Sequence, residues 1–408
     1  MRSGLVGKGM INPRLDLLTD FTFQRLARLL EPIAPPAGER PIDLSIGSPQ
    51  HPVPALLTET LTAHAEAWNR YPPAAGTPAF RQAAAGWLGR RFDLPAGLID
   101  PDRHLLPVAG TKEALFLIAL VAVPEAKDGR RPAVLMPNPF YNVYLGAAVM
   151  AGAEPVLLPA TAATGHLPDL AALTPALLRR SAVFYLCSPA NPQGAAADLG
   201  YFRRALELAR AYDVLLVVDE CYSEIYPSEP PAGVLQAAAM AGGDLANLLV
   251  FHSLSKRSSA AGLRSGFVAG DPRLIGAFAR LRGYAAAVQP LPVLAAATAL
   301  WQDDAHVAVN RDLYTEKFRL ANARLLPYFG PVCPDGGFSL WLDVGDGEAT
   351  ARRLWQEAGL KVLPGVYLGR PGADGENPGE RYIRLALVHD LATTVDALDR
   401  LVAAISRR

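Results

Sequence analysis

The sequence predicts an α/β protein: a large domain with a mostly parallel central sheet sandwiched by helices, plus a smaller α+β domain. From residue 133 onward, continuously apolar runs of strand length alternate with helical stretches. Such runs are typical of strands that helices bury on both faces, as in parallel sheets. After about residue 285 the pattern changes to a long helical region and then to short strands and helices. We therefore expect a large domain over residues 48–288 and a small domain over residues 289–408, with segment 11–47 packing against the small domain.

The composition favours a globular protein and argues against several other classes. Half of the 408 residues are hydrophobic, which is enough for two domains with a large core. Lys plus Arg and Asp plus Glu both number 39, so no overall charge favours nucleic acid or a membrane surface. The three cysteines and seven histidines lack disulfide or metal-ligand spacing. This cysteine usage favours a reducing cytoplasm, and the spacing of the cysteines and histidines predicts no metal site. Because no apolar run reaches the roughly 18 residues of a membrane span, we expect a soluble protein.

The N-terminal region is predicted to consist of helices joined by loops. A short extended piece and an amphipathic helix span residues 12–30, and further helices span 56–68 and 79–92. A short strand, Ile42–Ile46, leads into a loop rich in Gly and Pro. Gly47 in this loop could bring a backbone N–H close to a ligand, or it could simply meet the conformational need of a turn.

Two further segments could bind an anion. Gly110-Thr111-Lys112 opens an apolar helix, and the free N–H groups of a helix N-terminus attract anions, although Thr111 could also serve only as a cap. Arg384 lies in the middle of an apolar strand, Tyr382–Leu387, which follows another predicted strand at Gly336–Asp343. An arginine there is costly unless it meets an anionic ligand or a neighbouring carboxylate.

Four polar clusters follow apolar runs that we predict to be strands. Because ligands in parallel sheets bind beyond the carboxyl ends of the strands, we expect these clusters to meet at one edge of the sheet. The predicted strands are 133–136, 155–158, 182–187, 214–218, 248–251 and 266–269, and the clusters are 138–141, 188–194, 219–222 and 253–256.

Lys256 is the candidate reactive amine. It lies in the stretch Phe251–Gly266, where Ser253 and Ser255 supply hydroxyls and Arg264 supplies a positive charge. Such a group suits a phosphorylated aldehyde, because the hydroxyls and guanidinium would bind the phosphate while the amine condenses with the carbonyl. Taken alone, a serine-rich segment with Lys and Arg is more often a solvated turn.

Asp219 ends a fully apolar strand, so its carboxylate would lie in a dry cleft. There it could pair with a protonated ring nitrogen and help a heterocycle to withdraw electrons. Tyr222 and Asn191 could hydrogen-bond a phenolic oxygen of the same ring, and Tyr141 could stack on it. An acidic strand end also occurs in P-loop ATPases, but the sequence has no G-x-x-x-x-G-K-[ST] motif.

Taken together and in order, these residues resemble the class I/II, fold type I pyridoxal-phosphate aminotransferases over nearly the whole chain. The resemblance implies the fold type I architecture, with residues 48–288 binding pyridoxal 5'-phosphate, and amino-acid and keto-acid substrates such as glutamate and 2-oxoglutarate. It also implies a homodimer in which Tyr71 reaches the phosphate in the neighbouring subunit's site. Lys256, Asp219 and Tyr222 would be the catalytic residues. The implied contacts are Lys256 with the cofactor aldehyde, Asp219 with the ring nitrogen, Asn191 and Tyr222 with the ring oxygen, Tyr141 with the ring face, Thr111, Lys112, Ser253 and Arg264 with the phosphate, and Gly47 and Arg384 with the substrate's α-carboxylate.

Within this family, several segments resemble the succinyldiaminopimelate aminotransferases of bacterial lysine biosynthesis: 137–141, Asp219–Tyr226, 253–258 and Leu363-Pro364-Gly365. The resemblance implies transamination between N-succinyl-LL-2,6-diaminopimelate and 2-oxoglutarate, with Arg257 and His51 as candidates for the distal end of the substrate or for loop packing. Other interpretations stay open: an aspartate, acetylornithine or aromatic (kynurenine-type) aminotransferase, a pyridoxal-phosphate β-lyase, or a non-catalytic cofactor sensor. The sequence departs from the narrower pattern at Ser48, Gln50, Gln193, 259–261 and 283–289.

Overall fold

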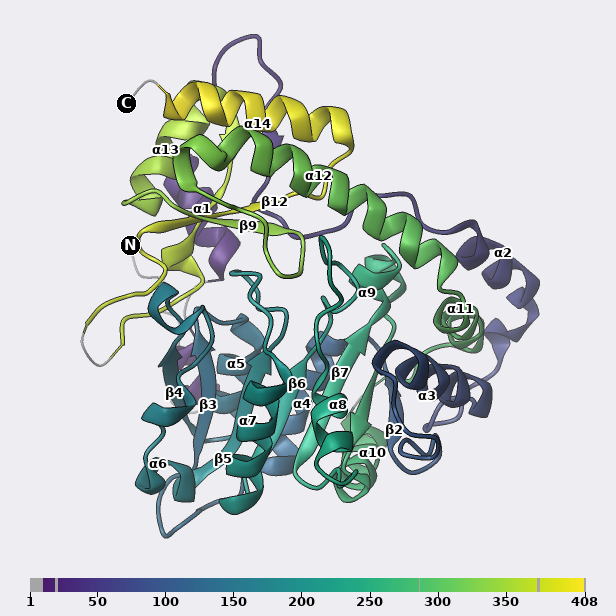
Figure 1. Cartoon of the computed structure of the whole chain (residues 1–408). Helices are drawn as coiled ribbons and strands as arrows, with labels where there is room; N and C mark the ends of the chain where they lie inside the picture. Colours follow the sequence, from purple (N-terminus) through teal and green to yellow (C-terminus); the bar gives the residue numbers. More distant parts are fainter. Residues whose placement is uncertain (1–9, 19–20, 286, 373–374, 407–408) are drawn as a thin grey trace.

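A seven-stranded sheet forms the centre of the larger part of the molecule and fills the lower half of Figure 1. The computed structural model describes residues 10–18, 21–285, 287–372 and 375–406. The strand order is β2-β8-β7-β6-β5-β3-β4, in which β8 is antiparallel to β2 and β7 while the other neighbours are parallel. The strands are β2 (Leu105–Val108), β3 (Ala133–Asn138), β4 (Glu154–Pro159), β5 (Ser181–Cys187), β6 (Leu215–Asp219), β7 (Leu248–Ser253) and β8 (Gly266–Gly270).

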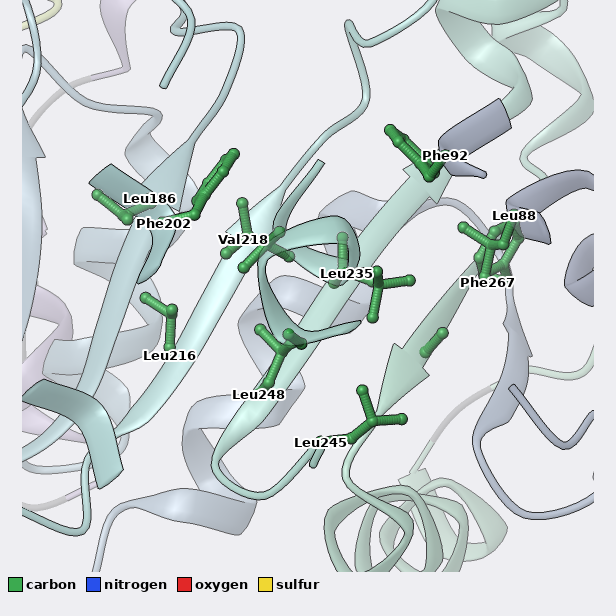
Figure 2. Packing of buried hydrophobic residues seen from close by; sticks show 14 of the residues in the cluster. Leu88, Phe92, Leu186, Phe202, Leu216, Val218, Leu235, Leu245, Leu248 and Phe267 are labelled. Atoms are coloured by element: carbon green, nitrogen blue, oxygen red, sulfur yellow. The ribbon is translucent and has the colours of Figure 1, made fainter. Parts of the chain in front are cut away.

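Helices cover both faces of this sheet, because successive strand residues point to opposite sides and most of them are apolar. Along β6, Leu216 and Val218 belong to one cluster of buried side chains, whereas Leu215 and Val217 belong to another. Figure 2 shows the first cluster, in which Phe202 from a covering helix packs with these strand residues. The helices of that cluster include α3 (Pro78–Phe92), α7 (Leu199–Ala211), α8 (Val234–Met240) and α11 (Leu291–Gln302), and those of the other include α4 (Thr111–Ala122), α5 (Asn142–Met150) and α10 (Pro272–Ala285).

A smaller sheet with its own core lies in the upper half of Figure 1. Its antiparallel strands are β11 (Leu363–Pro364), β12 (Tyr382–Ala386) and β9 (Ser339–Asp343), in that order, and β1 (Ile42–Asp43) pairs in parallel with β10 (Leu360–Lys361) nearby. The core around them takes side chains from α1 (Thr22–Leu30), α12 (Ala305–Phe329), α13 (Gly347–Ala358) and α14 (Leu391–Ile405). This architecture confirms the predicted fold class, and the predicted domain boundaries at residues 47 and 288 stay a prediction.

The long helix α12 connects the two parts of the molecule (Figure 1). Near its start, the side chain of Asn310 donates hydrogen bonds to the backbone oxygens of Lys256 and Arg257, which belong to α9 (Leu254–Arg257). Further along, Phe318 and Leu325 are part of the smaller core. The helix therefore fixes the segment that carries the candidate lysine relative to the smaller sheet.

Some element boundaries differ from the sequence-based prediction. β2 was not predicted, because its four residues include Pro107; it is an edge strand, and an edge strand tolerates proline. The predicted long helical region is divided into α11 and α12 at Asp303 and Asp304. The predicted helix 56–68 is α2 (Ala55–Ala63) followed by a 3-10 helix, Ala65–Asn69. None of the helices in the described ranges combines the length and the hydropathy that crossing a membrane requires.

Candidate active site

One cavity lies between the carboxyl ends of the parallel strands and the smaller sheet. Asp219 of β6 and Ser253 of β7 line it from the large sheet, and Leu363 of β11 and Arg384 of β12 line it from the smaller one. Its volume is about 700 Å³, which is within the usual range of small-molecule sites. All the predicted site residues except Tyr71 line this cavity: Gly47, Thr111, Lys112, Tyr141, Asn191, Asp219, Tyr222, Ser253, Lys256, Arg264 and Arg384.

The amine of Lys256 is held in the middle of this group. Its Nζ donates a hydrogen bond of 2.5 Å to the backbone oxygen of Gly47 and lies 4.8 Å from the ring centroid of Phe338. Burial, assisted by the positive charges of Arg384 and Arg264, lowers the pKa of Lys256 to about 8. Far more of this amine than of an ordinary lysine is therefore unprotonated near neutral pH, and a nucleophile or a base must be unprotonated.

The carboxylate of Asp219 is buried at the end of β6. Its Oδ2 accepts a hydrogen bond of 3.0 Å from the hydroxyl of Tyr144, and its Oδ1 accepts one of 3.2 Å from the backbone N–H of Cys221. Burial nevertheless raises the pKa of Asp219, since these donors offset only part of the lost hydration. A cation placed beside Asp219 would stabilise its charged form, so the site suits a protonated heterocycle.

Donors suited to a phosphate lie at the N-terminus of α4, the twelve-residue helix that begins at Thr111. The backbone N–H groups of a first helical turn are free to bind an anion. Gly110, which precedes the helix, has a φ of 82°, and a Cβ there would overlap the guanidinium of Arg264. Ser253 and Ser255, whose hydroxyl oxygens are 2.9 Å apart, line the same cavity. The close approach of Arg264 to the helix start brings a positive charge to these donors.

Arg384 is buried on β12, with 5% of its surface exposed. Its two terminal nitrogens donate to the backbone oxygen of Ser45 at 2.5 Å and to Oδ1 of Asn191 at 3.3 Å, and its Nε has no hydrogen-bond partner. These acceptors are neutral, so the described contacts of Arg384 do not include the neighbouring carboxylate that the sequence left open. A buried guanidinium without a counter-charge suits a carboxylate ligand.

These residues fit pyridoxal phosphate, the cofactor that the sequence resemblance implies. The site offers an amine of lowered pKa for the aldehyde, a buried carboxylate for the ring nitrogen, and a helix start with hydroxyls and a guanidinium for the phosphate. Tyr222 and Asn191 line the same cavity and could bind the ring oxygen, while Tyr141 could cover the ring face.

Three residues that the sequence analysis named as candidates for binding the cofactor or the substrate do not line the cavity. The side chain of Tyr71 is fully exposed, so its contact with a neighbouring subunit stays a prediction. Arg257 is buried; it lies 5.4 Å from the ring centroid of Trp87 and donates to the backbone oxygen of Leu300 at 2.6 Å. His51 is buried as well and bonds to Asn310. Of the two roles considered for Arg257 and His51, these contacts favour packing, since neither residue lines the cavity.

The sequence reasoning missed other residues of the cavity and its wall. Tyr144, which holds Asp219, follows Tyr141 by three residues on α5, and that helical spacing was the available signal. Arg370 and Asn142 line the cavity, as do apolar residues of the N-terminal segment such as Phe21 and Phe23. Nothing in the local sequence around these residues indicates a site, because distant segments bring them together.

Comparisons with known proteins show which family this chain is similar to. Residues 39–401 match the family described as aminotransferase class I and II. An aminotransferase of known structure from Neisseria meningitidis Z2491 is 41% identical, with a TM-score of 0.92 over 97% of this chain and 100% of that chain. The 4-dedimethylamino-4-oxo-anhydrotetracycline transaminase OxyQ of Streptomyces rimosus is 34% identical over 90% of this chain and 92% of its own length. An LL-diaminopimelate aminotransferase of Desulforudis audaxviator is 31% identical over 97% of each chain.

Proposed function

Because this chain belongs to the class I and II aminotransferases, which use pyridoxal phosphate, we propose that it transfers an amino group between N-succinyl-LL-2,6-diaminopimelate and 2-oxoglutarate. The observation that carries the proposed chemistry is the meeting of three groups in one cavity: a lysine amine of lowered pKa, a buried carboxylate and a buried arginine. The segments 137–141, Asp219–Tyr226 and Leu363-Pro364-Gly365, which resemble succinyldiaminopimelate aminotransferases, support the choice of substrate.

Bound pyridoxal phosphate supplies an aldehyde that takes the amino group and a ring that withdraws electrons from the substrate's Cα. In the proposed arrangement, Asp219 holds the proton on the ring nitrogen, and Tyr144 keeps the carboxylate in position. The remaining contacts orient the cofactor: Asn191 and Tyr222 bind its ring oxygen, Tyr141 covers its ring, and Thr111, Lys112, Ser253 and Arg264 bind its phosphate.

Lys256 has two tasks in this proposal. It would hold the cofactor through its amine, and as a free amine it would move a proton between the substrate's Cα and the cofactor's C4' carbon. A pKa of about 8 suits both directions of this transfer, because a base works best when its pKa is close to the working pH.

Arg384 binds the substrate's α-carboxylate in this arrangement. Its guanidinium is already fixed by Ser45 and Asn191, so little side-chain freedom is lost when the carboxylate binds. Gly47 leaves the space: a Cβ there would come within 3.1 Å of the Phe338 ring and within 4.0 Å of the Arg384 guanidinium. The carboxylate is thereby placed close to the amine of Lys256, which bonds to Gly47.

A second candidate is transamination of LL-diaminopimelate itself. The likeness to the LL-diaminopimelate aminotransferase of Desulforudis audaxviator, at 31% identity over nearly the whole length of both chains, favours it. The two candidates share the reacting carbon and differ in whether the distal amino group carries a succinyl group.

The first experiment is an absorbance titration of the purified protein with amino donors in the absence of an acceptor. With L-glutamate, the yellow absorbance near ~420 nm should fall while absorbance near ~330 nm rises, as the cofactor takes up the amino group. Adding N-succinyl-2-amino-6-oxopimelate should restore the yellow absorbance, while oxaloacetate and acetylornithine semialdehyde should not. N-succinyl-LL-diaminopimelate should also serve as a donor.

The outcome distinguishes the candidates. If unmodified LL-diaminopimelate is the faster donor, the second candidate replaces the first. If glutamate leaves the yellow absorbance unchanged, the proposed amino donor is wrong, and β-lyase substrates should be tried next.

A further inference from the structure

Arg264, one of the proposed phosphate ligands, has a backbone conformation that its surroundings must hold in place. Its φ and ψ are both 54°, in the left-handed region, at the residue that follows a 3-10 helix, Ala261–Leu263. A residue with a Cβ enters this region only at an energetic cost, whereas glycine adopts it freely. Such a conformation persists only where contacts around the residue select it.

The direction of the Arg264 side chain depends on this conformation. The guanidinium lies so close to Gly110 that a Cβ there would overlap it, and Gly110 directly precedes α4. Its Nη1 also donates to the backbone oxygen of Ala261 at 3.0 Å. Because φ and ψ set the direction in which a side chain leaves the backbone, a change at Arg264 would move the guanidinium away from the start of α4.

A buried amide, that of Gln289, holds the backbone of Arg264. Gln289 is 3% exposed, and its Nε2 donates a hydrogen bond of 2.9 Å to the backbone oxygen of Arg264. Its Oε1 has no hydrogen-bond partner among the residues that the structure describes. Burying an unpaired oxygen is costly, and an apolar side chain of the same size would avoid that cost. The bond to Arg264, rather than packing, therefore accounts for an amide at this position.

The segment that carries Gln289 is supported on both sides. Pro290 directly precedes α11, one of the helices that contribute to the first cluster of buried side chains. On the other side, the guanidinium of Arg282 in the last turn of α10 donates to the backbone oxygens of Pro107 in β2, at 2.5 Å, and of Ala287, at 3.4 Å. The amide of Gln289 thus extends from a segment that is fixed both to the core and to the edge of the large sheet.

We infer that Gln289 is a positioning residue for the cofactor phosphate: its amide holds Arg264 in the left-handed conformation and thereby keeps the guanidinium at the start of α4. This inference rests on the phosphate-binding role proposed for Arg264. Gln289 does not line the cavity, so it acts through Arg264 and not by touching the cofactor. It lies in segment 283–289, where the sequence departs from the succinyldiaminopimelate aminotransferases, and the resemblance therefore gives it no role.

The test compares pyridoxal phosphate with pyridoxal, which has the same ring and aldehyde but no phosphate. Full-length protein loaded with either compound is dialysed against falling concentrations of that compound, and the loss of yellow absorbance gives the dissociation constant. Gln289→Met keeps the length of the side chain and removes the donor. It should raise the dissociation constant for pyridoxal phosphate about fivefold and leave that for pyridoxal unchanged, because only the phosphate contact depends on Arg264. Gln289→Leu, a second apolar substitution, should give the same result.

Arg264→Gln tests the residue through which Gln289 acts. This variant should raise the dissociation constant for pyridoxal phosphate by about tenfold or more, as expected for the loss of hydrogen bonds to a charged group. Adding Gln289→Met to Arg264→Gln should weaken binding no further, because the backbone conformation no longer matters once the guanidinium is absent.

Gln236→Met is the matched control for Gln289→Met. The Oε1 of Gln236 accepts one hydrogen bond of 2.9 Å from the backbone N–H of Gly233, so this variant also loses a single bond between a side-chain amide and the backbone. Gln236 does not line the cavity, and its contact involves no residue of the proposed phosphate site. The dissociation constants for both compounds should therefore stay unchanged.

The inference is overturned if Gln289→Met keeps the full affinity for pyridoxal phosphate while Arg264→Gln loses it. It is also overturned if Gln289→Met weakens both compounds equally, or if the effects of the two substitutions add, since Gln289 would then support the fold in general. If Arg264→Gln itself binds pyridoxal phosphate normally, the role proposed for Arg264 fails and the inference fails with it. The proposed reaction is decided separately, by the absorbance titration with glutamate and the succinylated acceptor.

Discussion

The ammonium Nζ of Lys317 lies 2.6 Å from Nε2 of the His51 imidazole, and both side chains are buried. Which nitrogen of the His51 ring carries the hydrogen follows from the contact between His51 and Asn310. Asn310 donates through Nδ2 to two backbone oxygens, so its Oδ1, 2.8 Å from Nδ1 of His51, must accept. Nδ1 therefore carries the hydrogen, and Nε2 accepts from Lys317. Burial and then the positive charge of Lys317 both lower the pKa of His51, which keeps the ring neutral.

This arrangement joins the two sides of the candidate active site through α12. Asn310 donates to the backbone oxygen of Lys256, and Lys317, two helical turns further on, donates to the backbone oxygen of Leu387 at 3.1 Å. Leu387 follows Arg384 by three residues on the same segment. The lysine that would transfer the proton and the arginine that would hold the carboxylate are thereby fixed to one helix.

Replacing Lys317 with Met should change how stability depends on pH. Burial lowers the pKa of Lys317 to about 8, while an unfolded lysine has a pKa of about 10.4. Between these values the unfolded chain binds more protons than the folded one, so this group makes the free energy of unfolding rise with pH. In Lys317→Met the rise from pH 8 to pH 10 should be smaller, by up to about 3 kcal/mol.

Urea unfolding of the cofactor-loaded protein at several pH values measures this difference. The loaded form is used because the amine of Lys256, whose pKa is also lowered to about 8, is then occupied by the cofactor. Parallel pH profiles for the two proteins would show that Lys317 does not titrate in this range.

Replacing Gly110 with Ala should weaken cofactor binding. A Cβ at Gly110 would overlap the guanidinium of Arg264, and a φ of 82° is strained for alanine. Because Arg264 is one of the proposed phosphate ligands, we expect the dissociation constant for pyridoxal phosphate to rise about tenfold, which corresponds to about 1.4 kcal/mol. Titration of the cofactor-free protein, followed by absorbance, measures it.

Gly89→Ala is the matched control for Gly110→Ala. Gly89 lies within α3, and an added Cβ there meets nothing within 4 Å. This variant should bind the cofactor normally and be more stable by about 0.5–1 kcal/mol, as alanine is favoured over glycine in a helix. Equal cofactor affinity in both variants would contradict the role given to Gly110.

A strand of this fold could be predicted from the sequence where its own residues indicate it, and not where only its pairing with a distant segment does. The continuously apolar runs of β5, β6 and β7 predict buried parallel strands, because composition and length suffice for that inference. β2 escaped prediction because its pairing with β8 joins segments about 160 residues apart, and its own four residues contain a proline.

In the candidate site, too, some residues could be selected from the local sequence and others could not. Lys256, Asp219 and Arg384 could be selected because each is a polar residue in or beside an apolar strand, where burial without a ligand is costly. Arg370 could not, since an arginine in a loop is ordinary until its neighbours are known. For Tyr144 the only signal was its helical spacing from Tyr141, which does not reveal the bond to Asp219. Sequence also assigned no partner to His51, because Lys317 lies 266 residues away in the chain.

Replacing Tyr144 with Phe should impair catalysis through Asp219. The variant loses the hydroxyl that donates to Oδ2 of Asp219, one of the contacts that lower the pKa of that carboxyl group. The pKa of Asp219 should therefore rise, and the acid limb of the profile of kcat/KM against pH should move to higher pH. We expect kcat/KM at neutral pH to fall about tenfold, in line with the loss of a hydrogen bond to a charged group.

Tyr185→Phe provides the matched control for Tyr144→Phe. The two rings are stacked with centroids 4.7 Å apart and both are buried, but the hydroxyl of Tyr185 donates to the backbone oxygen of Leu115. Both variants should lose about 1 kcal/mol of stability through a buried hydrogen bond. Only Tyr144→Phe should shift the acid limb; a shift in both would assign the effect to general loosening of the core.

The pH dependence of cofactor loading should report the environment of Lys256. An amine attacks an aldehyde only when unprotonated, and burial lowers the pKa of Lys256 to about 8. The rate at which cofactor-free protein becomes yellow on mixing with pyridoxal phosphate should therefore rise through a midpoint near pH 8, about two units below that of an ordinary lysine. Stopped-flow absorbance from pH 6.5 to pH 9.5 covers the transition.

Removing the neighbouring charge in Arg384→Gln should move the midpoint upward, because that guanidinium helps to disfavour the ammonium. Lys256→Arg should bind the cofactor without becoming yellow in this way, since a guanidinium stays protonated throughout the range. A midpoint that stays above pH 9.5 would show that the amine is solvated like a surface lysine, and the proton-transfer role proposed for it would lose its physical basis.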